Sequence, residues 1–148
     1  MAEKQCLKIS LFLKKQPNLT DEFFHKHWKT QHVDVALRNR TFASKARRYN
    51  QVRQRVLSGG KARPADNSIV KVHITPELWE QARSFGIPVT EYDGIAEVWV
   101  DSLEDWKEVL ADPDFVTDVG ADEQHFILTP ISVQLSYDNL VIPDKNAA

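Results

Sequence analysis

The chain has 148 residues, 42% of them hydrophobic and 27% charged, with a formal net charge of -2 at pH 7. A nearly neutral chain offers no general field for polyanions, so the composition argues against nucleic acid as a partner. The length suffices to bury a core without disulfides or metal. We therefore expect a single globular domain over residues 1–148.

The compartment follows from the cysteine count and the polarity of the first residues. The one cysteine, Cys6, can form no disulfide within the chain, which fits a reducing compartment. The opening residues are polar and do not resemble a signal peptide. No apolar run approaches the roughly 20 residues that span a bilayer. These features predict a cytoplasmic protein with no membrane partner.

A strand and a long helix are predicted first. Residues 7–14 alternate apolar and polar side chains, which is the pattern of a half-buried strand. Thr20 is a suitable N-cap for a helix over 21–38. Asp21 and Glu22 stand in its first turn, where they complement the helix dipole.

The middle of the chain is less regular. Residues 47–57 predict a second strand that is rich in arginine. Residues 58–91 form an insert broken by glycine and proline, and within it 76–86 predict a short helix with proline at its first position.

The last third repeats a strand–helix–strand pattern. Residues 92–100 predict a third strand, and Ser102 is a suitable N-cap for the helix that runs to residue 112. A short helical turn is expected at 113–121, and the alternating residues 131–137 predict the fourth strand.

The order of these elements is β-α-β-β-α-β with an insert between strands 2 and 3. This order is typical of the ferredoxin-like α+β fold, in which both helices cover one face of a four-stranded antiparallel sheet. The other face of such a sheet needs a cover, and a second copy of the same sheet is the simplest one. The topology therefore predicts a homodimer.

Three of the five histidines surround one tryptophan in HKHWKTQH, residues 25–32. On a helical wheel, Trp28 and His32 fall about 40° apart on the stripe that should face the sheet. His27 falls at the flank and His25 near the edge of that stripe. His25 and His32 are about 10 Å apart along the axis, and the helix lacks the i, i+4 histidine pair of a zinc site. We expect neither a metal nor a cofactor.

Three segments resemble the EthD-domain family. Residues 20–36, TDEFFHKHWKTQHVDVA, resemble its first helix, and 92–106, YDGIAEVWVDSLEDW, are similar to its strand leading into the second helix. Residues 121–126, ADEQHF, match an acidic cluster followed by phenylalanine. The chain departs from the family where Phe23 replaces an acid and Asp34 a proline. The residues of the first helix that match in register are Thr20, Phe24, His27, Trp28, His32 and Ala36.

The resemblance implies a dimeric α+β barrel that works without a cofactor. Fungal members similar to this chain serve polyketide pathways, some as dehydratases or cyclases. The implied function is therefore a lyase acting on an aromatic polyketide-like molecule. Two alternatives stay open, which are a cofactor-free monooxygenase of the anthrone type and a non-catalytic carrier of a hydrophobic intermediate.

Dehydration or cyclisation of a β-hydroxy ketone needs a base and an acid, and a histidine can serve as either near neutral pH. We expect His32 to be one of the two groups, although its helical position also suits a core histidine bonded to backbone. Candidates for the second group are His73, Glu97 and Asp93. An exposed strand position is the alternative for His73.

Glu97 is the most informative of these candidates, because a carboxylate in an apolar strand needs a partner or a raised pKa. An ion pair with Arg53 or Arg55 on the neighbouring strand is the alternative. Aromatic side chains could form a flat wall for fused rings. The expected substrate-binding residues are Trp28, Tyr49, Trp99 and Phe12.

Overall fold

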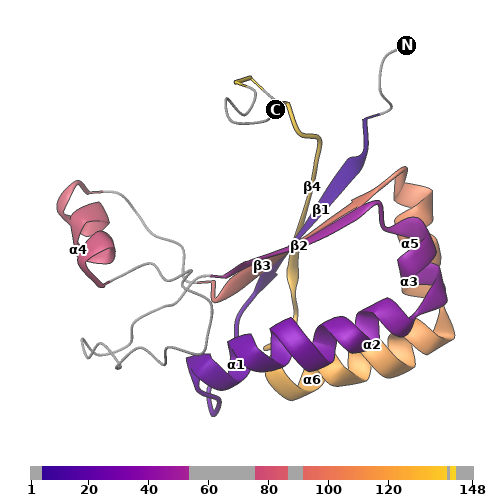
Figure 1. The fold of residues 1–148 in the computed structure, drawn as a ribbon, viewed down its shortest axis with the longest axis horizontal. Coiled ribbons are helices and arrows are strands. Elements are labelled where there is room, and N and C mark those ends of the chain that lie inside the picture. The colour runs from indigo at the N-terminus through magenta and orange to yellow at the C-terminus, as the bar shows by residue number, and fades with distance from the viewer. Residues whose placement is uncertain (1–4, 54–75, 87–91, 140, 143–148) are drawn as a thin grey trace.

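A computed structural model describes residues 5–53, 76–86, 92–139 and 141–142 (Figure 1). Within these ranges four strands form one antiparallel sheet in the order β2-β3-β1-β4. This is the strand order of a ferredoxin-like fold, so the predicted α+β class is confirmed. The strands are β1 (Leu7–Leu13), β2 (Arg48–Arg53), β3 (Gly94–Val100) and β4 (Ser132–Ser136).

The helices that follow β1 and β3 gather on one side of the sheet (Figure 1). Two of the helical segments, η1 and η2, are π-helical, which is rare and is often found at functional sites. The helical segments are α1 (Asp21–His27), η1 (Trp28–His32), α2 (Val33–Arg38), α3 (Arg40–Lys45), α4 (Pro76–Ser84), α5 (Leu103–Ala111), η2 (Phe115–Gly120) and α6 (Ala121–Phe126).

The predicted helix caps are confirmed. Thr20 Oγ1 accepts a hydrogen bond from the Phe23 N–H at 3.1 Å, so α1 begins where the sequence places it. Ser102 Oγ accepts from the Asp105 N–H at 3.2 Å and caps α5 in the same way. Each cap satisfies a backbone donor that the first helical turn would leave unpaired.

The helix predicted over 21–38 runs through α1, η1 and α2, with a wide turn in its middle that periodicity did not predict. Thr30 Oγ1 donates to the Lys26 carbonyl at 2.6 Å, which competes with the backbone ladder there. The turn predicted at 113–121 is too short, because η2 and α6 carry the helix to Phe126.

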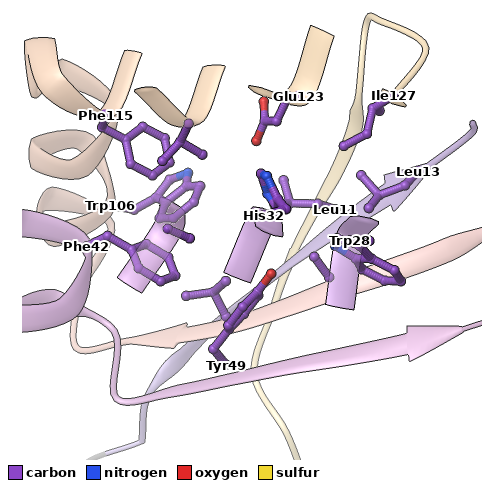
Figure 2. A pocket seen from close by; sticks show the side chains of 14 residues that line it. Leu11, Leu13, Trp28, His32, Phe42, Tyr49, Trp106, Phe115, Glu123 and Ile127 are labelled. Atoms are coloured by element: carbon purple, nitrogen blue, oxygen red, sulfur yellow. The ribbon is translucent and has the colours of Figure 1, made fainter. Parts of the chain in front are cut away.

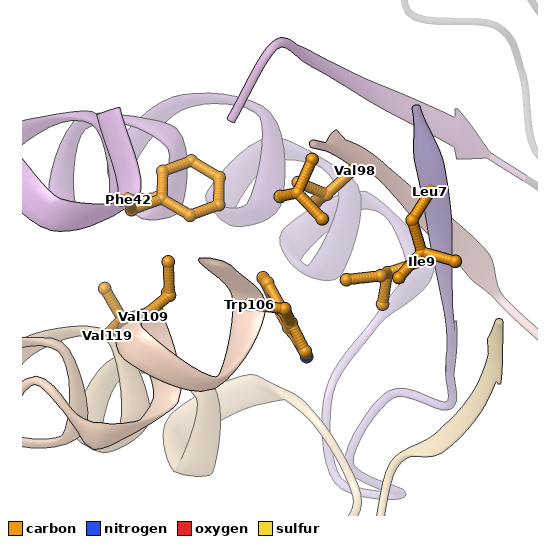
Figure 3. Close-up of a cluster of buried hydrophobic side chains, with 9 residues drawn as sticks. Leu7, Ile9, Phe42, Val98, Trp106, Val109 and Val119 are labelled. Atoms are coloured by element: carbon orange, nitrogen blue, oxygen red, sulfur yellow. The ribbon is translucent and has the colours of Figure 1, made fainter. Parts of the chain in front are cut away.

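The core lies between the helices and the inner face of the sheet. In the register of the two central strands, Ile9 pairs with Val98 and Leu11 with Ala96, so these side chains share one face. One buried cluster packs this face against α3, α5 and η2 (Figure 3). Its members are Leu7, Ile9, Ala36, Phe42, Val98, Val100, Trp106, Val109 and Val119.

Trp28 lies directly against β3 at Gly94. A Cβ built on Gly94 would lie 2.5 Å from Trp28 Cζ3, which is too close for any side chain. The indole is fully buried in a second apolar cluster that contains Phe24 and Phe126. The glycine at the start of β3 therefore makes room for the tryptophan of the histidine-rich helix.

The outer face of the sheet carries Phe12, Ile95, Glu97 and Trp99, the residues that alternate with the inner ones. The helices that follow β1 and β3 lie on the other side (Figure 1). Arg48 stacks over the Trp99 ring at 4.6 Å. No helix among the described residues is both long and apolar enough to cross a bilayer.

Candidate functional site

A cavity of about 30 Å³ lies between the helices and the inner face of the sheet (Figure 2). Its size as it stands leaves room for about two water molecules. The walls are apolar apart from an imidazole, a phenol and a carboxyl group. The lining residues are Leu11, Leu13, Trp28, His32, Ala36, Phe42, Tyr49, Ala96, Val98, Trp106, Phe115, Val119, Glu123 and Ile127.

His32 ends the π-helical turn that begins at Trp28, and both side chains line the cavity. A π turn bonds residue i to i+5, so it rotates less per residue than an α turn. His32 and Trp28 both stay on the inward side of this turn. The inward position predicted for both residues is observed.

Asp122 fixes the orientation of the His32 ring. Nδ1 of His32 lies 2.8 Å from Asp122 Oδ2, and Nε2 of His27 lies 2.9 Å from Asp122 Oδ1. An ionised carboxylate can only accept, so both imidazoles donate to it. His32 then carries its proton on Nδ1 and keeps a lone pair on Nε2 for a ligand. The alternative that His32 bonds to backbone is replaced by this carboxylate contact.

The ring of Phe126 packs against the imidazoles of both His32 and His27. Its centroid lies 5.1 Å from that of His32 and 4.7 Å from that of His27. His27 is therefore more than a flank residue, because it completes a chain of two histidines joined by Asp122.

Burial lowers the pKa of His32 below its ordinary value. The hydrogen bond and charge of Asp122 act in the opposite direction, and the nearby His27 adds to the lowering. The imidazole is thus neutral at neutral pH, which is the form that can accept a proton.

Tyr49 reaches the cavity from β2, and Figure 2 shows its hydroxyl directed toward the region of His32. The hydroxyl accepts a hydrogen bond from Gln51 Nε2 at 3.2 Å. Burial raises the pKa of Tyr49, so the phenol keeps its proton. A hydroxyl that accepts from the protein can donate its own proton to a ligand oxygen.

Glu123 reaches the cavity from α6, next to Asp122 in the chain (Figure 2). Burial in the apolar wall, together with the charge of Asp122, raises the pKa of Glu123 to about 7. The two acids of α6 thus differ in environment, since Asp122 is bonded to two imidazoles and Glu123 faces the cavity.

The structure brings together only some of the residues that the sequence predicts for the site. His32, Trp28 and Tyr49 line the same cavity. Glu97 and Trp99 lie on the outer face of the sheet, away from this cavity. Phe12 also lies on the outer face, where its ring packs at 5.1 Å from that of Tyr92.

Glu97 is held by an ion pair, as its alternative reading expects, but the described partner is Lys8, at 2.7 Å. Asn50 Nδ2 also donates to Glu97, at 3.0 Å. Burial acts to raise the pKa of Glu97, but the bonds from Lys8 and Asn50 outweigh it, and the pKa is lowered. The Glu97 carboxylate is thus bonded to Lys8 and Asn50 on the outer face of the sheet, and His32 lies on the other side.

Asp93 has a structural role at the turn that precedes β3. Its Oδ2 accepts from the Lys15 N–H at 2.8 Å, and its own N–H donates to the Leu13 carbonyl at 2.8 Å. Burial raises the pKa of Asp93. The side chain does not line the cavity. His73 and Arg55 lie outside the described residues, so the roles given to them stay predictions.

Sequence reasoning missed Asp122 and Glu123. The acidic cluster of 121–126 was noticed as part of a family pattern, but the helix was expected to end there. What places the two acids is the extension of the helix through η2 and α6. Among the described residues there is no group of three or more histidine, cysteine or acidic side chains arranged to hold a metal.

Comparison with known proteins identifies the family. The fold is that of a ferredoxin-like α+β protein. The chain belongs to the EthD family, because the model of the EthD domain matches residues 16–130. No curated protein matches the sequence.

Several solved structures share the fold. An ethyl tert-butyl ether d (ethd) family protein from Bacillus halodurans aligns with a TM-score of 0.52 and 12% identity, over 91% of this chain and 99% of its own. A dimeric protein of unknown function and ferredoxin-like fold from Bacteroides fragilis aligns with a TM-score of 0.51 and 12% identity, over 93% and 100%. Hydroxynitrile lyase from Passiflora edulis aligns with a TM-score of 0.55 and 10% identity, over 95% and 99%. At such identities the likeness concerns the fold.

Proposed function

We propose that this protein is a lyase that dehydrates or cyclises an aromatic polyketide-like β-hydroxy ketone by acid–base chemistry of its own side chains. The observation that carries the proposal is the 2.8 Å bond between His32 Nδ1 and Asp122. It leaves Nε2 of a neutral, buried imidazole available as a base. One distant structural neighbour, the hydroxynitrile lyase, is itself a lyase and is compatible with this class.

In this proposal His32 Nε2 removes a proton from the carbon next to the ketone. Tyr49 donates a hydrogen bond to the ketone oxygen and stabilises the enolate that forms. The general base contributes roughly 10²–10⁴ in rate. Expulsion of water from the cavity strengthens both interactions, because charges and dipoles interact more strongly in a low-dielectric site.

The walls support an aromatic substrate. Trp28, Tyr49, Phe42, Trp106 and Phe115 all line the cavity, and flat rings pack well against one another. A cavity of about 30 Å³ must widen before such a molecule enters. Phe115 and Val119, both on the π-helical segment η2, form part of this wall.

The test is elimination from a β-hydroxy tetralone, which loses water to form a naphthol. We expect turnover by the wild-type protein under argon and a loss of at least about 10²-fold in His32→Ala. Turnover that needs oxygen would indicate a monooxygenase instead. Tight binding with no rate enhancement would indicate a carrier, and normal turnover by His32→Ala would remove the central assignment.

We also propose that two copies associate through the outer face of the sheet, in the cytoplasm. Phe12, Ile95 and Trp99 give this face an apolar centre, and Lys8 with Glu97 gives it a polar pair. One structural neighbour is described as dimeric. Two such faces packed together would form a barrel. The single cysteine, Cys6, supports a reducing compartment.

A further inference from the structure

The carboxyl group of Glu123 stands out among the polar groups of the cavity. Its side chain makes no hydrogen bond or ion pair with any residue in the described part of the chain. The other titratable groups that line the cavity are matched, because His32 bonds Asp122 and Tyr49 bonds Gln51. The carboxyl is half-buried in an apolar wall, where an unpaired charge is unfavourable, so it points to a role with a ligand.

Glu123 follows Asp122 on the helix α6. On α6, Asp122 turns toward the two imidazoles while Glu123 points into the cavity from the helix layer, toward the His32 ring (Figure 2). The titratable groups that share the cavity with it are His32 and Tyr49, and Asp122 with its partner His27 lies next to it. The remaining lining side chains are apolar.

We propose that Glu123 is the general acid of the site, donating its proton to the hydroxyl group that leaves the substrate. This inference rests on the proposed function and supplies the second catalytic group. His32 Nε2 takes the proton from carbon, and the electron pair of that bond forms the new double bond. The carbon–oxygen bond breaks, Glu123 gives its proton to the departing hydroxyl, and water is the product.

The charge states match these roles at neutral pH. The environment of Glu123 raises its pKa to about 7, so a large share of the carboxyl groups is protonated. The pKa of His32 is lowered, so its imidazole is neutral. After one turnover His32 holds a proton and Glu123 lacks one, and transfer of that proton restores the starting state.

The experiment combines kinetics with a direct titration. Elimination from a β-hydroxy tetralone is followed against pH in the wild-type protein, Glu123→Gln, His32→Ala and the control Glu104→Gln, whose side chain is exposed on α5. We expect kcat/KM of the wild-type protein to fall on both sides of a maximum, with the alkaline limb near pH 7. Glu123→Gln should lose at least about 10²-fold in kcat and lack the alkaline limb.

Carbon NMR of glutamate-labelled protein gives a second readout that does not depend on turnover. The Glu123 resonance, assigned by its absence from Glu123→Gln, should titrate near pH 7. Titration at the ordinary value of 4.5 would overturn the inference. Full activity of Glu123→Gln with an inactive His32→Ala would overturn the role of Glu123 alone. An inactive wild-type protein would overturn the proposed function and this inference together.

Discussion

Asp122 Oδ2 accepts a hydrogen bond from His32 Nδ1 at 2.8 Å, across 90 positions of sequence. This contact selects the tautomer that carries the proton on Nδ1 and leaves a lone pair on Nε2 of His32, which lines the cavity. It also opposes the lowering of the His32 pKa by burial. The carboxylate of Asp122 therefore sets both the orientation of the His32 ring and the basicity of its Nε2.

Removal of this charge gives the first prediction. In Asp122→Asn we expect kcat to fall by roughly 10²-fold, because the ring loses its orientation. The pKa of His32 should fall further, so the acid limb of the pH profile moves to lower pH. The kinetic profile and an NMR titration of His32 measure both effects. Asp118→Asn, an exposed acid on η2, is the control. An unshifted acid limb in Asp122→Asn would contradict the pairing.

Stability against pH gives the second prediction. The pKa of Glu123 is about 7 in the folded chain and has an ordinary value of 4.5, so the native state binds the extra proton between these values. Stability therefore falls as pH rises from about 4.5 to about 7 and changes little above that range. The total is about 3 kcal/mol. Between urea unfolding at about pH 5 and at about pH 8, the wild-type protein should lose more stability than Glu123→Gln, by roughly this amount.

The third prediction concerns Gly94. An added methyl group would meet the ring of Trp28 at 2.5 Å, so Gly94→Ala should lower the free energy of unfolding by about 1–3 kcal/mol. Gly120→Ala is the matched control, because nothing lies within 4 Å of its added Cβ. That change should be neutral or stabilise the helix by up to about 1 kcal/mol. Equal melting temperatures for the two variants would show that Trp28 can move away.

The fourth prediction tests the outer face of the sheet. The wild-type chain should behave in light scattering as a particle of twice its 17.0 kDa mass. Ile95→Glu places a charge in the proposed contact and should give a monomer. Leu110→Glu changes an equally apolar, exposed residue in the helix layer and should leave the mass unchanged. A monomeric wild-type protein would rule out the dimer.

Much of the fold could be predicted from the sequence, because local signals and the global fold agree. The alternation of residues 7–14 and the caps Thr20 and Ser102 lie where the structure has a strand and two helix starts. The helix Arg40–Lys45 was missed. It begins at Asn39, whose side chain accepts from the Phe42 N–H at 2.8 Å, and its six residues are too few to show a period.

The site was harder to predict than the fold. His32 and Trp28 lie on one helix, so the helical period alone finds them. Asp122 approaches them from a segment 90 positions away, and only three-dimensional packing creates that contact. Glu97 was predicted for the site because it is a carboxylate in an apolar strand, but it lies on the outer face of the sheet. Strand alternation shows which residues share a face and does not show which face the helices cover.

The π turn from Trp28 to His32 affects the position of His32 in the site, while the packing of the fold depends on the flanking helices. A π turn contains one residue more than the α turn it interrupts, while the flanking helices keep Phe24 and Ala36 buried. We expect that deleting Thr30 would let the segment close into an ordinary helix and turn His32 away from Asp122. Descendants of this chain could therefore lose their chemistry through the loss of a single codon and still assemble the same sheet and helices.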